Sequence, residues 1–127
     1  VLLRVSADDY MEGGINKEEM VKIINEVKEY IDMVHVSTGG LISVRFPIFP
    51  GYQISHSETI KRECNIPTIA VGLINELDQI EEILYNNRAD LVAIGRGLLR
   101  DPHFVLNMAY KNRLKMKYPT QYERGYY

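Results

Sequence analysis

The stretch Leu91–Asp101, LVAIGRGLLRD, constrains the fold of this chain more than any other. It begins with four apolar residues, the pattern of a strand that is buried on both faces. A glycine-flanked arginine follows, and Asp101-Pro102 then has the sequence of a helix start. A strand that runs through a glycine loop into a helix suits a phosphate group, because Gly95 lets backbone N–H groups approach it and Arg96 adds a positive charge. The stretch therefore predicts an anion site.

A second stretch, Thr68–Ile74, repeats this pattern earlier in the chain, and its apolar run ends at Gly72. Each glycine taken alone is explained as well by a tight turn between a strand and a helix. Two consecutive strand–helix units with glycine loops are also the arrangement of the phosphate site after strands seven and eight of a TIM barrel. Together with the Gly95-Arg96 loop, the pair favours a cofactor that carries a phosphate group.

Strands and helices are predicted to alternate along the chain. We expect strands at residues 1–6, 33–37, 68–71 and 91–94, and helices at residues 16–31, 55–64, 75–85 and 101–114. This order predicts an α/β fold with a parallel sheet and right-handed crossovers. A complete eight-stranded barrel needs about 250 residues, so four strand–helix units correspond to half of a TIM barrel with an open inner face.

Capping residues predict where three of these helices begin. Asn16 is the expected cap of the first helix, with Glu19 at the capping-box position. Asn75 and Asp101 are expected to cap the third and the last helix. The apolar face of the first helix is predicted to consist of Met20, Ile23, Ile24, Val27 and Ile31.

Composition limits the classes of function. The 127 residues suit one globular domain, and a net charge of −2 gives no reason to expect nucleic acid or an anionic membrane as partner. The single cysteine, Cys64, fits a reducing compartment and a structural thiol. No apolar run reaches the ~20 residues of a membrane span, so we expect a cytoplasmic protein. The chain opens directly on a strand at Val1, which suggests a part of a longer protein.

Seven short motifs are distributed over essentially the whole chain. They are Leu3–Tyr10, Val36–Gly40, Phe49–Gln53, Ala70–Ile74, Ala89–Arg96, Leu99–Pro102 and Gln121–Tyr126. In this order and spacing they resemble the carboxyl-terminal half of the Old Yellow Enzyme family. The terminal Gln-Tyr-Glu-Arg-Gly-Tyr narrows the resemblance to the bacterial NADPH dehydrogenases of its thermophilic-like ene-reductase class.

The resemblance implies an FMN-dependent oxidoreductase in which NADPH reduces the flavin and the flavin passes hydride to an activated alkene. Arg4 matches the arginine near flavin N1 and O2, where a cation stabilises the charge of reduced flavin. Cofactor contacts are also implied for Thr38, Gly72, Gly95 and Arg96, the last three at the phosphate.

The resemblance also implies a homodimer or homotetramer. Residues 1–114 would form the half-barrel with the phosphate site, and residues 115–127 an extended tail that carries Arg124 into the substrate pocket of a neighbouring subunit. The family's carbonyl ligands, tyrosine proton donor and flavin-tuning cysteine belong to the other half of the barrel. We therefore expect this chain alone to be inactive, and we predict no metal site.

The three histidines fall outside the family motifs. His35 is expected to be packed in its strand, whereas His56 and His103 are expected at helix starts, either solvated or capping. Two alternatives stay open at this point. In the first alternative, the chain would be a non-catalytic half-barrel that pairs with a copy of itself. In the second, it would be half of another barrel enzyme that binds FMN or a phosphate.

Overall fold

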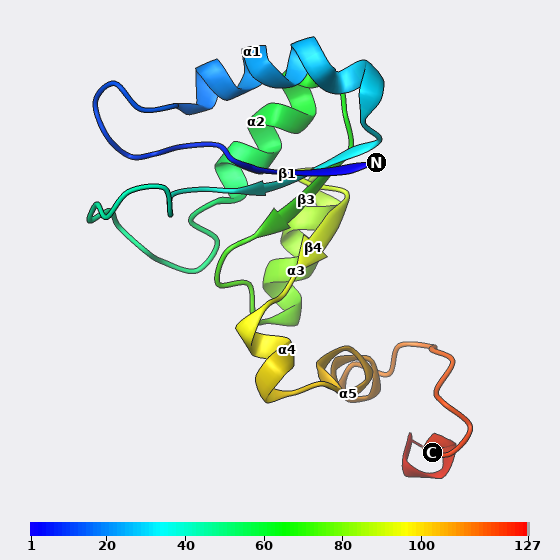
Figure 1. Cartoon of the computed structure of the whole chain (residues 1–127). Helices are drawn as coiled ribbons and strands as arrows, with labels where there is room; N and C mark the ends of the chain where they lie inside the picture. Colours follow the sequence, from blue (N-terminus) through cyan, green and yellow to red (C-terminus); the bar gives the residue numbers. More distant parts are fainter. Residues whose placement is uncertain (127) are drawn as a thin grey trace. The chain divides into compact units, whose positions relative to one another are not determined.

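The computed structural model describes residues 1–126 and divides into two compact units, Val1–Ile94 and the residues from Gly95 onward, each of which is described by itself. The elements of the first unit are β1 (Leu2–Ser6), α1 (Lys17–Val27), the 3-10 helix η1 (Lys28–Tyr30), β2 (Met33–Ser37), α2 (Ile54–Cys64), β3 (Thr68–Val71), α3 (Leu77–Tyr85) and β4 (Leu91–Ala93) (Figure 1). The second unit contains α4 (Arg96–Arg100), α5 (Phe104–Lys111) and the 3-10 helix η2 (Glu123–Tyr126).

The four strands form one parallel sheet in the order β1-β2-β3-β4. Every crossover between neighbouring strands contains a helix, so each strand returns in the same direction. This confirms the predicted α/β fold of four strand–helix units, the architecture of part of a TIM barrel. In register, Arg4 pairs with His35, His35 with Ile69, and Ile69 with Leu91.

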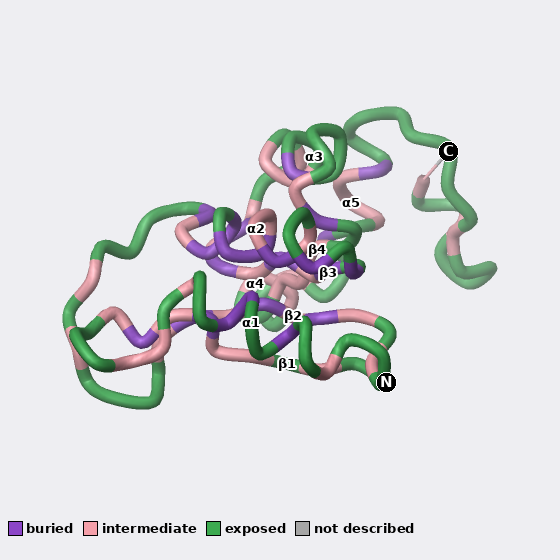
Figure 2. Tube along the Cα trace, turned by 90° about the horizontal axis from the view of Figure 1, so that it is seen from above, coloured by how far each residue is buried: buried purple, intermediate pink, exposed green. Residues whose placement is uncertain are grey.

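Helices α1, α2 and α3 of the first unit cover one face of this sheet. Val34 and Val36 of β2 are fully buried in a core that they share with residues of α1 and α2. Ala70 of β3 lies in a second core with Ile83 of α3. Buried residues accordingly concentrate on β2, β3 and α2 (Figure 2). Each large apolar side chain removed from water in this way contributes about 1.5–3 kcal/mol to folding.

The opposite face of the sheet is open. Because side chains alternate along a strand, this face carries the residues between the core positions. Leu2 is 66% exposed and Leu91 is 52% exposed, although both belong to strands. Arg4 is also exposed there, and His35 is half-buried. An open inner face is the feature expected for half of a barrel.

The capping box predicted for α1 is confirmed. The Glu19 N–H donates to Asn16 Oδ1 at 2.9 Å, and the Asn16 N–H donates to Glu19 Oε2 at 3.3 Å. The predicted apolar face of this helix was partly wrong: Val21 is buried beside Met20 and Ile24, whereas Ile23 is 43% exposed. The apolar stripe is rotated by part of a turn because α2 packs against the Val21 side.

Two other predicted caps were wrong. Helix α3 begins at Leu77 with Glu76 at the cap, since the Asn75 N–H donates to Gln79 Oε1 at 3.3 Å. Helix α5 begins at Phe104 because the Asp101 carboxylate accepts from the His103 N–H at 3.1 Å and holds residues 101–103 in a turn. The expected division after residue 114 stays a prediction.

Across residues 1–126 there is no helix with the length and apolar character that a membrane crossing requires. Cys64, in agreement with the expectation of a structural thiol, is buried at the end of α2. Burial raises the pKa of this thiol, which disfavours the reactive thiolate.

Replacement of Asn16 by alanine should lower the free energy of unfolding by about 1 kcal/mol, because the N–H of Glu19 loses its acceptor. Urea unfolding followed by circular dichroism measures this loss. Asn25→Ala, at an exposed position inside the same helix, is the matched control and should leave stability unchanged or slightly raised. Equal effects of the two substitutions would contradict the capping role.

Candidate functional site

A single buried side chain, that of Gln53, joins two strands at their carboxyl ends. Its Oε1 accepts from the Thr38 N–H and the Thr38 hydroxyl, both at 2.8 Å, and from Ser37 Oγ at 3.3 Å. Its Nε2 donates to the Val71 carbonyl at 2.9 Å. Because Thr38 follows β2 and Val71 ends β3, the amide holds together the strand edge from which functional loops of such barrels start.

Gly72 is required by this arrangement. Its φ is +128°, and a Cβ on it would lie 2.9 Å from Gln53 Nε2 and 3.2 Å from a ring carbon of Tyr52. Its carbonyl also accepts from the Gly51 N–H at 2.9 Å. The structure thus gives an internal reason for glycine at this position, and the predicted contact of Gly72 with a phosphate stays a prediction.

Thr38 is buried, and its polar groups are bonded within the chain. Besides its bonds to Gln53, Thr38 Oγ1 accepts from the Tyr10 hydroxyl at 2.9 Å. Thr38 therefore holds the loop after β2 in place, and its predicted contact with a cofactor is not tested by these bonds.

Gly95, in the loop after β4, has more open surroundings than Gly72. A Cβ on Gly95 would meet no atom within 4 Å among the described residues. The Gly95 carbonyl accepts from the N–H groups of Leu98 and Leu99 and so starts α4. Arg96 is the first residue of that helix and is exposed. Among residues 1–126 no atom crowds the position of a Cβ on Gly95, so there is room for a ligand beside this residue.

Arg4 and His35 meet on the open face of the sheet. Arg4 Nη1 lies 3.3 Å from His35 Nδ1 and 3.5 Å from His35 Nε2. Partial burial and then the charge of Arg4 lower the pKa of His35, so the neutral imidazole acts as an acceptor for the guanidinium. Among residues 1–126 no carboxylate lies within 4.0 Å of Arg4. The positive charge of Arg4 is therefore available to an anionic or electron-rich ligand.

A cluster around Asp8 and His56 was missed by the sequence analysis. His56 Nε2 lies 3.1 Å from Asp8 Oδ2, and the His56 side chain is only 11% exposed, so the expectation of a solvated or capping histidine was wrong. The rings of Tyr10 and His56 are in an edge-to-face arrangement with their centroids 6.1 Å apart. Tyr10 also stacks on Phe46, with ring centroids 3.9 Å apart. Burial raises the pKa of Tyr10.

The fold explains why these groups meet. β1 and β2 are parallel neighbours, so their carboxyl ends lie at the same edge of the sheet, and Gln53 holds the start of α2 at that edge through its bond to Thr38. A histidine in the first turn of α2 can therefore reach Asp8, two residues after β1. Phe46 comes from the long connection between β2 and α2, and its stacking on Tyr10 anchors that connection over the carboxyl ends of the strands. The sequence signal that was available is the Asp8-Asp9-Tyr10 run, which begins two residues after the end of a strand.

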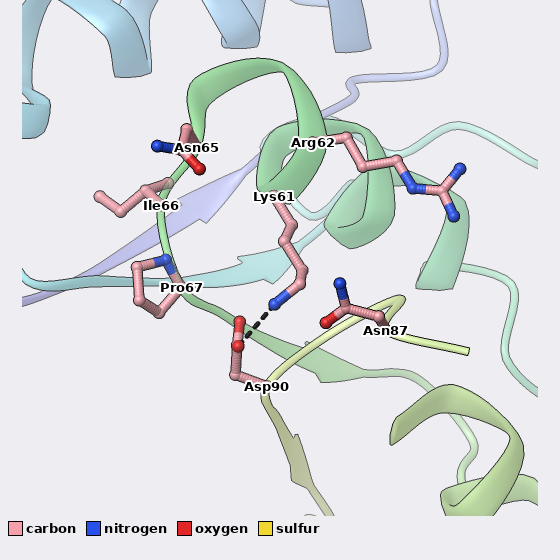
Figure 3. Close-up of a pocket in the computed structure, with 7 residues that line it drawn as sticks. All are labelled: Lys61, Arg62, Asn65, Ile66, Pro67, Asn87 and Asp90. Atoms are coloured by element: carbon pink, nitrogen blue, oxygen red, sulfur yellow. Dashed lines mark hydrogen bonds and ion pairs between the residues drawn. The ribbon is translucent and has the colours of Figure 1, made fainter. Parts of the chain in front are cut away.

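A pocket at the amino ends of β3 and β4 does not have the character of a functional site (Figure 3). Lys61 Nζ lies 2.5 Å from Asp90 Oδ1, and Asp90 Oδ2 accepts from the Thr68 N–H at 2.8 Å. Burial on its own raises the pKa of Asp90, but the hydrogen bonds from Lys61 and Thr68 outweigh it and lower the pKa. The charge of Lys61 is neutralised, so this end of the sheet serves stability. No group of His, Cys, Asp and Glu in the described part is arranged to hold a metal ion.

The tail contacts a helix of its own unit. Tyr126 stacks on Tyr118 with ring centroids 4.1 Å apart and lies edge-on to Tyr110 of α5 at 5.7 Å. Arg124 is exposed in η2. His103 is exposed, in agreement with the expected solvated position. The placement of Arg124 in a neighbouring subunit stays a prediction.

The chain is similar to proteins of known class. Residues 1–115 match the model of a family described as NADH:flavin oxidoreductase / NADH oxidase. The chain is 56% identical to an NADPH dehydrogenase of Clostridium acetobutylicum, a match that covers 99% of this chain and 38% of that protein. It is 43% identical to an NADPH dehydrogenase of Geobacillus thermodenitrificans, with 99% of this chain and 37% of that protein covered. The chain thus spans well under half of these relatives.

The steric clash that a side chain at position 72 would make with Gln53 gives a test of the site geometry. Gly72→Ala should destabilise the chain through its positive φ and through the 2.9 Å contact with Gln53 Nε2, which the bond to Val71 prevents from moving away. In a Gln53→Ala background the second cost disappears, so the effect of Gly72→Ala should be smaller by about 1 kcal/mol.

Gly40→Ala is the control for strain alone, since its φ is +90° and a Cβ there would meet nothing within 4 Å. Its effect should be the same with and without Gln53. Urea unfolding of the three single and two double variants measures both couplings, and an equal cost of Gly72→Ala in both backgrounds would refute the geometry.

Proposed function

The chain belongs to the NADH:flavin oxidoreductase / NADH oxidase family, and we propose that it is the carboxyl-terminal part of a longer FMN-dependent NADPH dehydrogenase, here named the parent enzyme. The family match supports the resemblance to the Old Yellow Enzyme family that the motifs predicted. FMN would accept hydride from NADPH and pass it to an activated alkene. The names of the relatives support NADPH as the hydride donor.

The observation that carries this proposal is the free charge of Arg4. Arg4 projects from the open face of β1, has a neutral histidine as its polar neighbour and has no carboxylate partner among residues 1–126. A fixed cation of this kind stabilises the negative charge that reduced flavin carries near N1. We assign this role to Arg4.

The phosphate of FMN is assigned to the loops after β3 and β4. Gly95 leaves space around the backbone at the start of α4, and Arg96 offers an exposed guanidinium. Gly72 is the corresponding residue after β3, and Thr38 supports the loop after β2. These residues bind and orient the cofactor, and none of them transfers a proton to the substrate.

The chain carries only part of the catalytic machinery. Substrate positioning and proton donation belong to the amino-terminal part of the parent enzyme, so the chain alone should have no activity. We further propose a cytoplasmic homodimer or homotetramer in which Arg124 of each tail enters the substrate pocket of a neighbour. The stacked tyrosines of the tail support an ordered segment, and the free Cys64 is compatible with a reducing compartment.

The parent enzyme should be isolated with bound FMN, and anaerobic NADPH should bleach the oxidised flavin absorbance, which cyclohexenone then restores. Arg96→Ala should weaken FMN binding by about 1.5–3 kcal/mol, the contribution of one hydrogen bond to a charged group. Equilibrium dialysis measures this loss.

Arg100→Ala is the matched control, because Arg100 is exposed at the end of the same short helix. Equal FMN affinity of the Arg96 and Arg100 variants would contradict the phosphate assignment. NADPH-dependent turnover by a pure preparation of residues 1–127 would contradict the proposed division of the machinery.

Arg124→Ala in the parent enzyme should lower kcat/KM about tenfold or more, since one charged contact to the substrate or flavin is lost, while FMN content stays unchanged. A mixed oligomer tests whether Arg124 acts in the neighbouring subunit. Coexpression of an Arg4→Gln subunit with an Arg124→Ala subunit should restore activity, because one pocket then combines Arg4 of one subunit with Arg124 of the other.

Arg113→Ala, at an exposed position outside η2, is the control and should keep full activity. If Arg124 acts within its own subunit, the mixed oligomer contains no complete pocket, and its activity does not rise above that of the Arg124→Ala enzyme. That result would refute the exchange of tails.

A further inference from the structure

The contact between Arg4 and His35 is fixed by the backbone. The two residues are register partners on neighbouring parallel strands, so their side chains leave the sheet side by side on the same open face. Arg4 Nη1 lies within 3.5 Å of both ring nitrogens of His35. Whichever nitrogen lacks a proton in the neutral ring, the guanidinium can therefore reach an acceptor.

The surroundings of His35 favour this neutral form. Its register partner on β3 is Ile69, and Met33 lies on the same face two residues earlier. Partial burial and the nearby charge of Arg4 both lower the pKa of His35. A protonated ring would offer no acceptor and would repel the guanidinium, so the pair holds together only with a neutral imidazole.

An arginine needs such a partner if its charge is to act at a fixed point. The side chain is long and has many rotamers, and ordering it costs conformational entropy at the moment when it must meet a ligand. A hydrogen bond to His35 orders Arg4 in advance without cancelling its charge, whereas a carboxylate in the same place would neutralise it.

We propose that His35 is a positioning residue that holds the Arg4 guanidinium in place and thereby favours reduced over oxidised FMN. This inference rests on the proposed function, because it takes Arg4 as the cation beside the flavin. His35 itself does not touch the reacting atoms. It acts by fixing the position of the positively charged Arg4 guanidinium. This position affects the binding of reduced flavin more than that of oxidised flavin, because the reduced form carries the additional negative charge.

The test is the midpoint potential of FMN in the parent enzyme, measured by anaerobic dye equilibration. His35→Ala should weaken the binding of reduced FMN about tenfold relative to oxidised FMN, which for a two-electron couple is a fall of about 30 mV. His35→Asn, which keeps a neutral acceptor near the position of Nδ1, should restore most of the potential. Met33→Ala is the matched control on the same strand and face and should leave the potential unchanged.

The outcomes separate this inference from the proposed function. If Arg4→Gln lowers the potential but His35→Ala does not, the positioning role is refuted and the proposed function stands. If the parent enzyme binds no FMN, or if Arg4→Gln leaves the potential unchanged, the assignment of Arg4 fails as well. A purely structural role of His35 would lower the melting temperature without changing the potential. Should His35→Ala not fold, His35→Leu retains apolar volume without an acceptor and is measured in its place.

Discussion

The parallel register of β1 to β4 is the constraint on which the rest of the structure depends. It places Arg4 beside His35 on the open face and brings the carboxyl ends of the strands to one edge. A shift of β1 by one residue would turn Arg4 toward the helices, where Leu3 and Val5 now pack. Burial of an unpaired guanidinium in that core is costly, so the alternation of apolar and polar residues in β1 selects the register.

At the carboxyl edge the sheet ends and its last backbone groups need other partners. Gln53 supplies them, since its amide accepts from the Thr38 N–H and donates to the Val71 carbonyl. Gln53 is also the last residue before α2. Its bonds to Thr38 and Val71 therefore anchor the end of the long β2–α2 connection to the carboxyl ends of β2 and β3. The requirement for glycine at position 72 then follows, because the Gln53 amide occupies the space that a side chain there would need.

Local patterns in the sequence predicted what depends on neighbours along the chain. The strands at residues 33–37 and 68–71 have the predicted bounds, and the capping box at Asn16 is present. The pair of Asp8 and His56 could not be predicted in this way, because 48 residues separate them and only the crossover brings them together. The predicted cap at Asp101 failed for a related reason, since its carboxylate also accepts from the Asn107 side chain and stabilises a turn before the helix.

The distribution of charge separates stability from function within the first unit. At the amino ends of β3 and β4 the cation of Lys61 is paired with Asp90, and nearby Arg88 is paired with Glu58. Such pairs keep loops in place but leave no net charge for a ligand. Arg4 has a neutral partner instead, so its position is restricted while its charge is retained. A carboxylate at position 35 would cancel the charge of Arg4, whereas the histidine leaves that charge unpaired, which is the arrangement that the proposed role of Arg4 requires.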